Sequence, residues 1–123
     1  MRLLALDVGQ RRTGAAFCEE DMGVPLALPT IEHNSLPSLL THVQLLAEAR
    51  HIQEIILGHP LLLSGKEGKQ AEYVRECAEA LRAAGFRVHL LDERFTTPRN
   101  ASGDGDAAAA CAILLTFLAR KGS

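Results

Sequence analysis

The chain has 123 residues, 47% of them hydrophobic, and its formal net charge at pH 7 is -2. This length suits one domain around one core, so we expect a single domain over residues 1–123. A charge this close to zero excludes a general attraction to polyanions, which would have to be bound by a local basic patch or by metal. Every apolar run is interrupted by glycine, proline or a charged residue, which argues against a membrane span.

The cysteines are odd in number and far apart, and they lack C-x-x-C spacing. No secretory hydrophobic segment precedes them. We therefore expect Cys18, Cys77 and Cys111 to be reduced thiols of a cytoplasmic protein, packed in the core rather than reactive.

The first third of the chain is typical of an antiparallel meander. Residues 2–8 and 13–19 are short apolar runs separated by a glycine-containing turn, and residues 24–32 form a third run. Pro25 and Pro29 interrupt the third run. Because proline cannot donate to a strand ladder, we expect this strand at a sheet edge.

The rest of the chain alternates between helical and strand patterns. Helix starts are indicated by capping residues and one helix end by a glycine. The predicted elements are a helix capped by Asn34 or Ser35 and reaching at least Ala47, a buried strand at 54–58, a helix containing Val74 to Leu81 and ended by Gly85, a strand at 87–93, and a helix from Asp106 to about Arg120.

This order of elements predicts an α/β fold with a mixed five-stranded sheet, antiparallel on one side and parallel on the other, and with helices on both faces. Right-handed crossovers place the strands at 2–8, 54–58 and 87–93 side by side. Asp7, Gly58 and Glu93 should then emerge at the same edge of the sheet.

Three acidic residues lie where a strand ends or a helix begins: Asp7, Glu93 and Asp106. Ligands of such folds bind at the carboxyl ends of parallel strands, and a helix N-terminus keeps a carboxylate ionised. An all-oxygen cluster suits Mg²⁺ or Mn²⁺ rather than zinc. Asp92 and Glu93 are neighbours on a strand, so their side chains should point to opposite faces and only one of them should reach this crevice.

The segment from Asp7 to Gly14 is ambiguous when taken alone. Its glycines allow a tight turn with the backbone close to a ligand. Similar Asp-x-Gly openings occur in phosphate loops of actin-like ATPases, and an aspartate at a strand end is often only a turn residue.

Four segments taken together resemble the YqgF/RuvX family, nucleases of RNase H fold related to Holliday junction resolvases. Their order, spacing and residue types all match, from Met1 to about Leu118. They are D-x-G-x-x-R-x-G at residues 7–14, G-x-P at 58–60, D-E-R-x-T at 92–96 and D-A-x-A-A at 106–110.

The resemblance implies that Asp7, Glu93 and Asp106 bind Mg²⁺ or Mn²⁺ and are the catalytic residues for hydrolysis of phosphodiester bonds. Two ions about 3.5 to 4 Å apart would be bridged by Asp7, one of them activating water. The activity proposed for the family is trimming of the 5′ end of precursor 16S ribosomal RNA, and cleavage of DNA junctions is the older inference.

Basic residues near the acids in sequence can neutralise backbone phosphates despite the negative net charge. Aromatic residues are scarce, so we expect recognition of backbone and shape rather than base stacking. The predicted substrate-binding residues are Arg11, Arg12, Lys66, Lys69 and Arg94, with Arg99 a further basic residue close by.

The chain departs from the family pattern at two places. Residues 98–105 form a short, bare connection where the family usually has a helix and a basic loop, so a substrate-gripping element is missing there. His59 lies in the G-x-P loop, where it either contacts phosphate or is a loop residue with no chemical role. Asp104 is either a fourth ligand or, as we favour, a helix cap.

Two other classes of protein compete with a nuclease. A non-catalytic nucleic-acid-binding module of the same fold would not need all three acids. An actin-like ATPase would need a second lobe to clamp its nucleotide. The sequence does not decide whether the substrate is RNA or DNA, or whether cleavage is endo- or exonucleolytic. It also does not decide whether the protein is a monomer or a weak homodimer.

Overall fold

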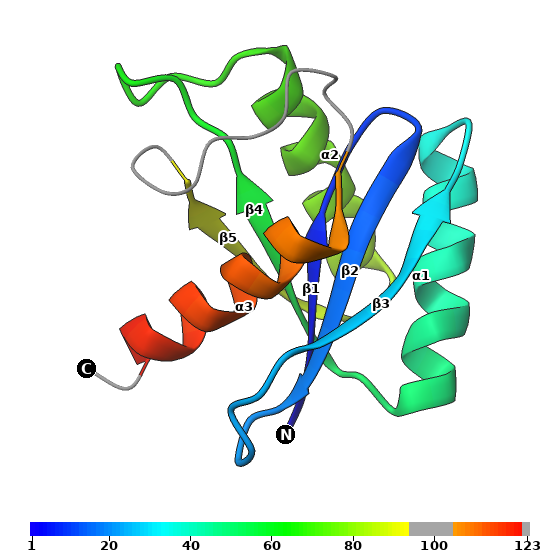
Figure 1. The fold of residues 1–123 in the computed structure, drawn as a ribbon. Helices are drawn as coiled ribbons and strands as arrows, with labels where there is room; N and C mark the ends of the chain where they lie inside the picture. The colour runs from blue at the N-terminus through cyan, green and yellow to red at the C-terminus, as the bar shows by residue number, and fades with distance from the viewer. Residues whose placement is uncertain (94–104, 122–123) are drawn as a thin grey trace.

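The computed structural model describes residues 1–93 and 105–121. Arg94, Arg99, Asp104 and nearly all of the 98–105 connection lie outside the described residues. Within them the predicted order of strands and helices is confirmed (Figure 1). The elements are β1 (Arg2–Asp7), β2 (Arg12–Glu19), β3 (Leu26–Glu32), α1 (Leu36–Arg50), β4 (Glu54–His59), α2 (Lys69–Ala83), β5 (Arg87–Asp92) and α3 (Ala107–Lys121).

The five strands form one sheet in the order β3-β2-β1-β4-β5. β1 pairs antiparallel with β2, and β2 with β3. β1 pairs parallel with β4, and β4 with β5. The mixed sheet is therefore as predicted, and β3 is an edge strand. It begins at Leu26 rather than residue 24, directly after Pro25.

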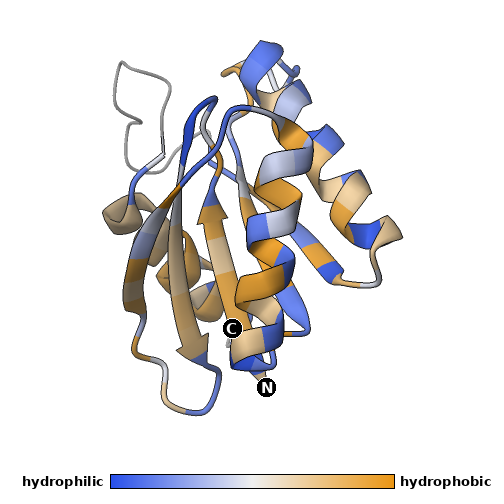
Figure 2. Ribbon diagram, turned by 90° about the vertical axis from the view of Figure 1, so that its right-hand side faces the viewer, coloured by the Kyte–Doolittle hydropathy of each residue, from blue (hydrophilic) through white to orange (hydrophobic). Residues whose placement is uncertain are grey.

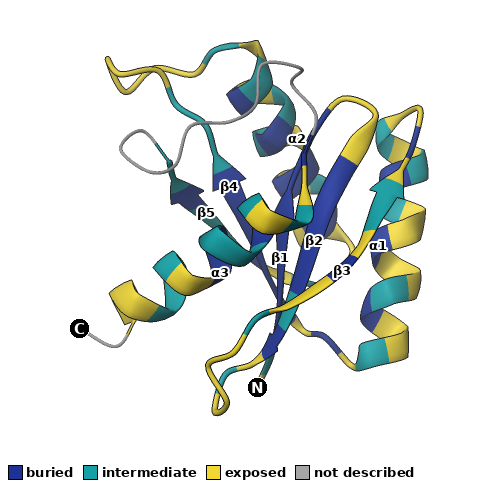
Figure 3. Cartoon of the chain, in the orientation of Figure 1, coloured by how far each residue is buried: buried dark blue, intermediate teal, exposed yellow. Residues whose placement is uncertain are grey.

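Each face of the sheet is covered by helices (Figure 1). Because strand side chains alternate between faces, Leu4 and Leu6 of β1 pack into a core shared with α1 and α2, whereas Leu3 and Ala5 pack beneath α3. β1 and β4 are buried almost throughout (Figure 3). The strands are mostly apolar, and the helices carry both polar and apolar stretches (Figure 2).

Local signals in the sequence set the helix ends. The Ser38 N–H donates to Ser35 Oγ at 3.2 Å, so Ser35 rather than Asn34 caps α1. After α2 the chain turns at Gly85, whose φ of 103° favours glycine, and the Phe86 N–H donates to the Leu81 carbonyl.

Among the described residues no helix combines the length and apolarity that crossing a membrane requires.

The cysteines are free thiols, as predicted. Cys18 and Cys77 are buried and Cys111 is half-buried. Burial raises the pKa of Cys77 to about 12, so this thiol stays protonated at neutral pH and serves as core packing.

Candidate active site

The parallel strands bring Asp7, Gly58 and Glu93 to one edge of the sheet, as the crossovers predict. Leu6 of β1 aligns with Leu57 of β4, and His59 of β4 aligns with Asp92 of β5. Asp7 is the last residue of β1. Glu93 follows β5, and its N–H donates to the His59 carbonyl at 3.2 Å.

The third acid reaches this edge through the start of α3. The Asp106 N–H donates to Asp7 Oδ2 at 3.0 Å. Asp106 Oδ1 in turn accepts from the Ala109 N–H at 2.7 Å and caps α3, the role that we expected of Asp104. Asp7 is only 3% exposed, whereas Asp106 is exposed. The positive end of α3 therefore stabilises a buried carboxylate.

Two glycines let the start of α3 lie directly on β1 and β2. A Cβ on Gly14 would be 2.0 Å from the Asp106 carbonyl oxygen, and one on Gly105 would be 1.7 Å from that of Asp7. The Gly105 N–H also donates to the Arg12 carbonyl at 2.9 Å. In this segment Gly14 therefore lets the protein's own backbone, at the start of α3, approach β2 closely.

A third glycine makes room for Glu93. A Cβ on Gly58 would lie 2.5 Å from Glu93 Oε2 and 2.7 Å from Ile113 Cδ1 of α3. The Glu93 side chain therefore lies across the end of β4, beside α3. Asp7 Oδ1 and Glu93 Oε2 are both buried oxygen atoms. Two carboxylates with buried oxygens thus lie at the same edge as Asp106.

The chemistry of these donors fits a hard divalent cation, because all of them are carboxylate oxygens. Within residues 1–93 and 105–121, however, no three His, Cys, Asp or Glu side chains gather closely enough to hold a metal ion. Much of a cation's coordination shell would therefore have to come from water and from the oxygens of a bound phosphate.

The predicted substrate-binding residues lie on two sides of this edge. Arg11 and Arg12 are exposed at the turn between β1 and β2 and line a depression of about 470 Å³. Lys66 is exposed in the loop after β4, and Lys69 is the first residue of α2. The turn and the loop lie at the same end of the sheet (Figure 1).

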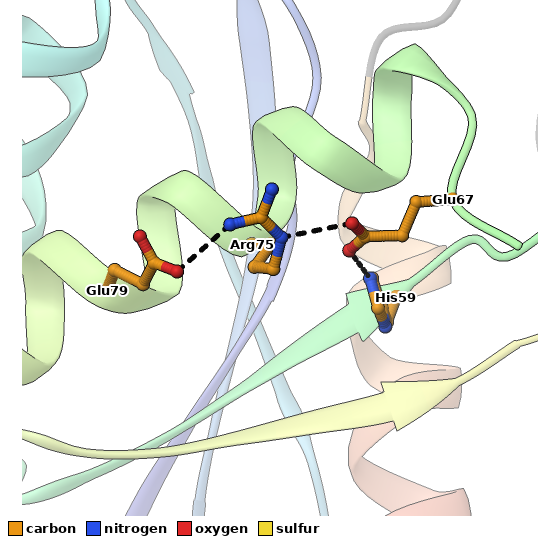
Figure 4. A network of polar contacts seen from close by, with 4 residues as sticks. All are labelled: His59, Glu67, Arg75 and Glu79. Carbon is orange, nitrogen blue, oxygen red and sulfur yellow. Dashed lines mark hydrogen bonds and ion pairs between the residues drawn. The ribbon is translucent and has the colours of Figure 1, made fainter.

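A polar network fixes the loop that carries Lys66 (Figure 4). His59 Nε2 lies 2.9 Å from Glu67 Oε2, and the Arg75 guanidinium donates to both Glu67 and Glu79 at 3.0 Å. The Arg75 hydrogen bond, followed by that of His59, lowers the pKa of Glu67. His59 therefore has a structural contact that links the end of β4 to this loop.

Gln70 is a positioning residue that the sequence did not reveal. Its Nε2 donates to the Val8 carbonyl at 2.7 Å, and its Oε1 accepts from Gln10 at 3.1 Å. The start of α2 therefore holds the turn that follows Asp7. A glutamine near a helix start carries no local pattern that would indicate this contact.

Together, the fold and this edge define an α/β domain of RNase H-like type. The fold matches T. thermophilus RuvC solved with a Holliday junction substrate, at a TM-score of 0.64 and 15% identity over 100% of this chain and 97% of that one. It also matches a fowlpox virus resolvase solved with substrate Holliday junction DNA, at a TM-score of 0.63 and 9% identity over 100% of both chains. At these identities the likeness concerns the fold alone.

The chain belongs to the RuvX family, whose model, described as "Holliday junction resolvase", matches residues 1–120. Relatives from Thermus thermophilus and Syntrophus aciditrophicus are 38% and 35% identical over 98% and 96% of this chain, and over 98% and 88% of their own lengths. A Chloroflexus aurantiacus relative is 34% identical over 77% of this chain but only 63% of its own length. Each carries the name "Putative pre-16S rRNA nuclease".

The contact of α3 with β2 predicts that Gly14→Ala is destabilising. The added methyl would overlap the Asp106 backbone, so we expect the free energy of unfolding to fall by at least about 1–3 kcal/mol in urea denaturation. Gly68→Ala is the control, because its Cβ would only make ordinary contact with Leu62 and the cost should stay below about 1 kcal/mol. Equal losses for both variants would contradict the close approach.

The network around Glu67 predicts a pH-dependent contribution to stability. Because the folded pKa lies below the ordinary 4.5, ionised Glu67 stabilises the fold above about pH 4.5, and this contribution is lost as the pH falls further. Glu67→Gln should lower the melting temperature at pH 7, and the difference from the unmodified protein should shrink below pH 4.5. Glu76→Gln, exposed on α2, controls for the loss of charge. A difference that does not change with pH would contradict this role of Glu67.

Proposed function

We propose that the protein is a metal-dependent nuclease that hydrolyses phosphodiester bonds during processing of the 5′ end of precursor 16S ribosomal RNA. The observation that carries the proposal is the buried carboxylate of Asp7, which accepts the Asp106 N–H at the edge where Glu93 also lies. Membership of the RuvX family and the names of the relatives support a nuclease. The choice of precursor 16S ribosomal RNA as the substrate is taken from those names.

Asp7, Glu93 and Asp106 are the residues that would contribute carboxylate ligands to Mg²⁺ or Mn²⁺, and water and a bound phosphate would supply the remaining ligands. A bound divalent ion supplies an activated water molecule and stabilises charge on the leaving oxygen. Asp7 is kept in place by the Asp106 N–H and by the turn that Gln70 holds. Glu93 extends across Gly58 toward the same edge, and Asp106 presents a carboxylate to solvent.

The basic residues would bind the substrate on either side of the acids. Arg11 and Arg12 would bind phosphates at the turn between β1 and β2, and Lys66 and Lys69 would bind them at the opposite side. The loop with Lys66 is held by the His59–Glu67–Arg75 contacts, so its position is set before the substrate binds. Such contacts fix the position of a strand without reading its bases.

A second candidate function is cleavage of branched DNA. The family description names a Holliday junction resolvase, and both matching folds were solved with junction DNA. Recognition through backbone and shape would suit a junction as well as a structured RNA. The two substrates therefore have to be compared directly.

The experiment measures Mn²⁺-dependent cleavage of a labelled precursor 16S fragment and of a four-way DNA junction, in parallel. Asp7→Asn keeps the size of the side chain but removes a charged ligand, so cleavage should fall at least about 100-fold. Metal-free stability should change by less than about 1 kcal/mol, because a weaker bond to the Asp106 N–H is offset by reduced repulsion among the acids. Asp21→Asn, exposed in the turn after β2, is the matched control.

Preferential cleavage of the RNA by the unmodified protein would support the proposal, whereas preference for the junction would favour the second candidate. Full activity of Asp7→Asn would contradict the assignment of Asp7. Binding of both substrates without cleavage of either, in Mg²⁺ and in Mn²⁺, would favour a non-catalytic nucleic-acid-binding module.

A further inference from the structure

A depression of about 470 Å³ lies between the turn after β1, the end of β3 and the start of α1. Two of its lining residues are arginines and one is acidic, so the charged side chains around it sum to a positive charge. Amide and hydroxyl groups add neutral hydrogen-bond donors. The lining residues are Arg11, Arg12, Glu32, His33, Asn34 and Ser38.

Two hydrogen bonds of His33 fix the wall of this depression. The His33 N–H donates to the Arg11 carbonyl at 2.9 Å. His33 Nε2 lies 2.8 Å from the Thr13 hydroxyl, and both side chains are buried. The end of β3 is therefore tied to the start of β2 by main chain and side chain together, which gives the two arginines a rigid base.

The depression is next to the candidate active site. The Arg12 carbonyl accepts the N–H of Gly105, the residue before Asp106. Arg12 is also two positions from Gly14, which pairs with Asp7 across β1 and β2. The backbone of Arg12, a residue that lines the depression, is therefore in contact with the segment that leads into Asp106.

We propose that this depression binds one phosphodiester group of the nucleic-acid strand, at a fixed distance from the bond that is cut. Guanidinium groups bind phosphate oxygens through pairs of charge-assisted hydrogen bonds, and Arg11 and Arg12 bring two of them to one place. Asn34 and Ser38 offer further donors to the same group. The inference rests on the proposed nuclease function and adds to it a second point of attachment.

Such an attachment would determine which bond reaches the acids. A strand held only at the scissile phosphate could slide by one nucleotide, because backbone phosphates are all alike. A second phosphate bound at a fixed distance sets the position of the strand without reading its sequence. It would also supply a contact with the substrate from the turn after β1.

The test measures binding of a single-stranded RNA oligonucleotide without terminal phosphates, over a series of salt concentrations. The double variant Arg11→Gln/Arg12→Gln keeps the backbone carbonyls that accept from His33 and Gly105, and its melting temperature is measured to check that the fold is retained. Affinity should fall about ten- to a hundredfold. Log affinity decreases with log salt, and this decrease should become less steep by about 0.7 for each backbone phosphate that the variant no longer binds.

Arg120→Gln is the control, because it removes a positive charge from the far end of α3, about 20 Å along the helix from Asp106. Its affinity and salt slope should stay close to those of the unmodified protein. If the double variant melts at a lower temperature, Asn34→Ala, which alters an exposed residue of the lining, takes its place.

A second measurement follows the His33 imidazole resonances by NMR while the oligonucleotide or inorganic phosphate is added. The proposal predicts a shift with the oligonucleotide that the double variant abolishes. A shift with inorganic phosphate but none with the oligonucleotide would overturn it in favour of a site for free phosphate. An unchanged salt slope together with no shift would overturn it altogether. These readouts do not depend on cleavage. A protein without nuclease activity would contradict the proposed function, but binding at this site could still be measured on it.

Discussion

The hydrogen bond from the Asp106 N–H to Asp7 Oδ2 is the contact on which the arrangement of the site depends. It joins residues 99 positions apart in the chain and is formed by a carboxylate that is almost fully buried. An ionised carboxylate buried at the end of β1 carries a desolvation penalty, which this hydrogen bond helps to offset. The same contact stabilises Asp7 and brings the start of α3, and therefore Asp106, to the edge of the sheet.

The rest of the edge is built around that contact. The missing side chains of Gly14 and Gly105 let the backbone of α3 lie against β1 and β2, and the missing side chain of Gly58 leaves room for Glu93. Gly14 also lies where the pairing of β2 with β3 shifts register, so the strand is irregular where α3 meets it. The exposed basic side chains at the turn after β1 lie outside this close packing.

Much of the fold could be predicted from the sequence because it depends on local patterns. The alternation of apolar runs, the prolines before and within β3 and the capping Ser35 each act over a few residues. The ends of β1 and β5 could be brought together by the rules of parallel crossovers. The docking of α3 through Gly14 and Gly105, the bond from Gln70 to Val8 and the pairing of Thr13 with His33 join distant segments by packing, which no local pattern encodes.

The central claim is that a divalent cation binds at the edge formed by Asp7, Glu93 and Asp106. Adding Mn²⁺ in small amounts to the ¹⁵N-labelled protein and recording amide line broadening tests it most directly, because the effect decreases steeply with distance from the ion. We predict broadening of the amides around Asp7, Gly58 and Asp106, and its loss in Asp7→Asn. Glu54 and His89 form a carboxylate–imidazole pair at the other end of β4, which begins at Glu54 and ends at His59. Broadening centred on that pair instead would contradict the account.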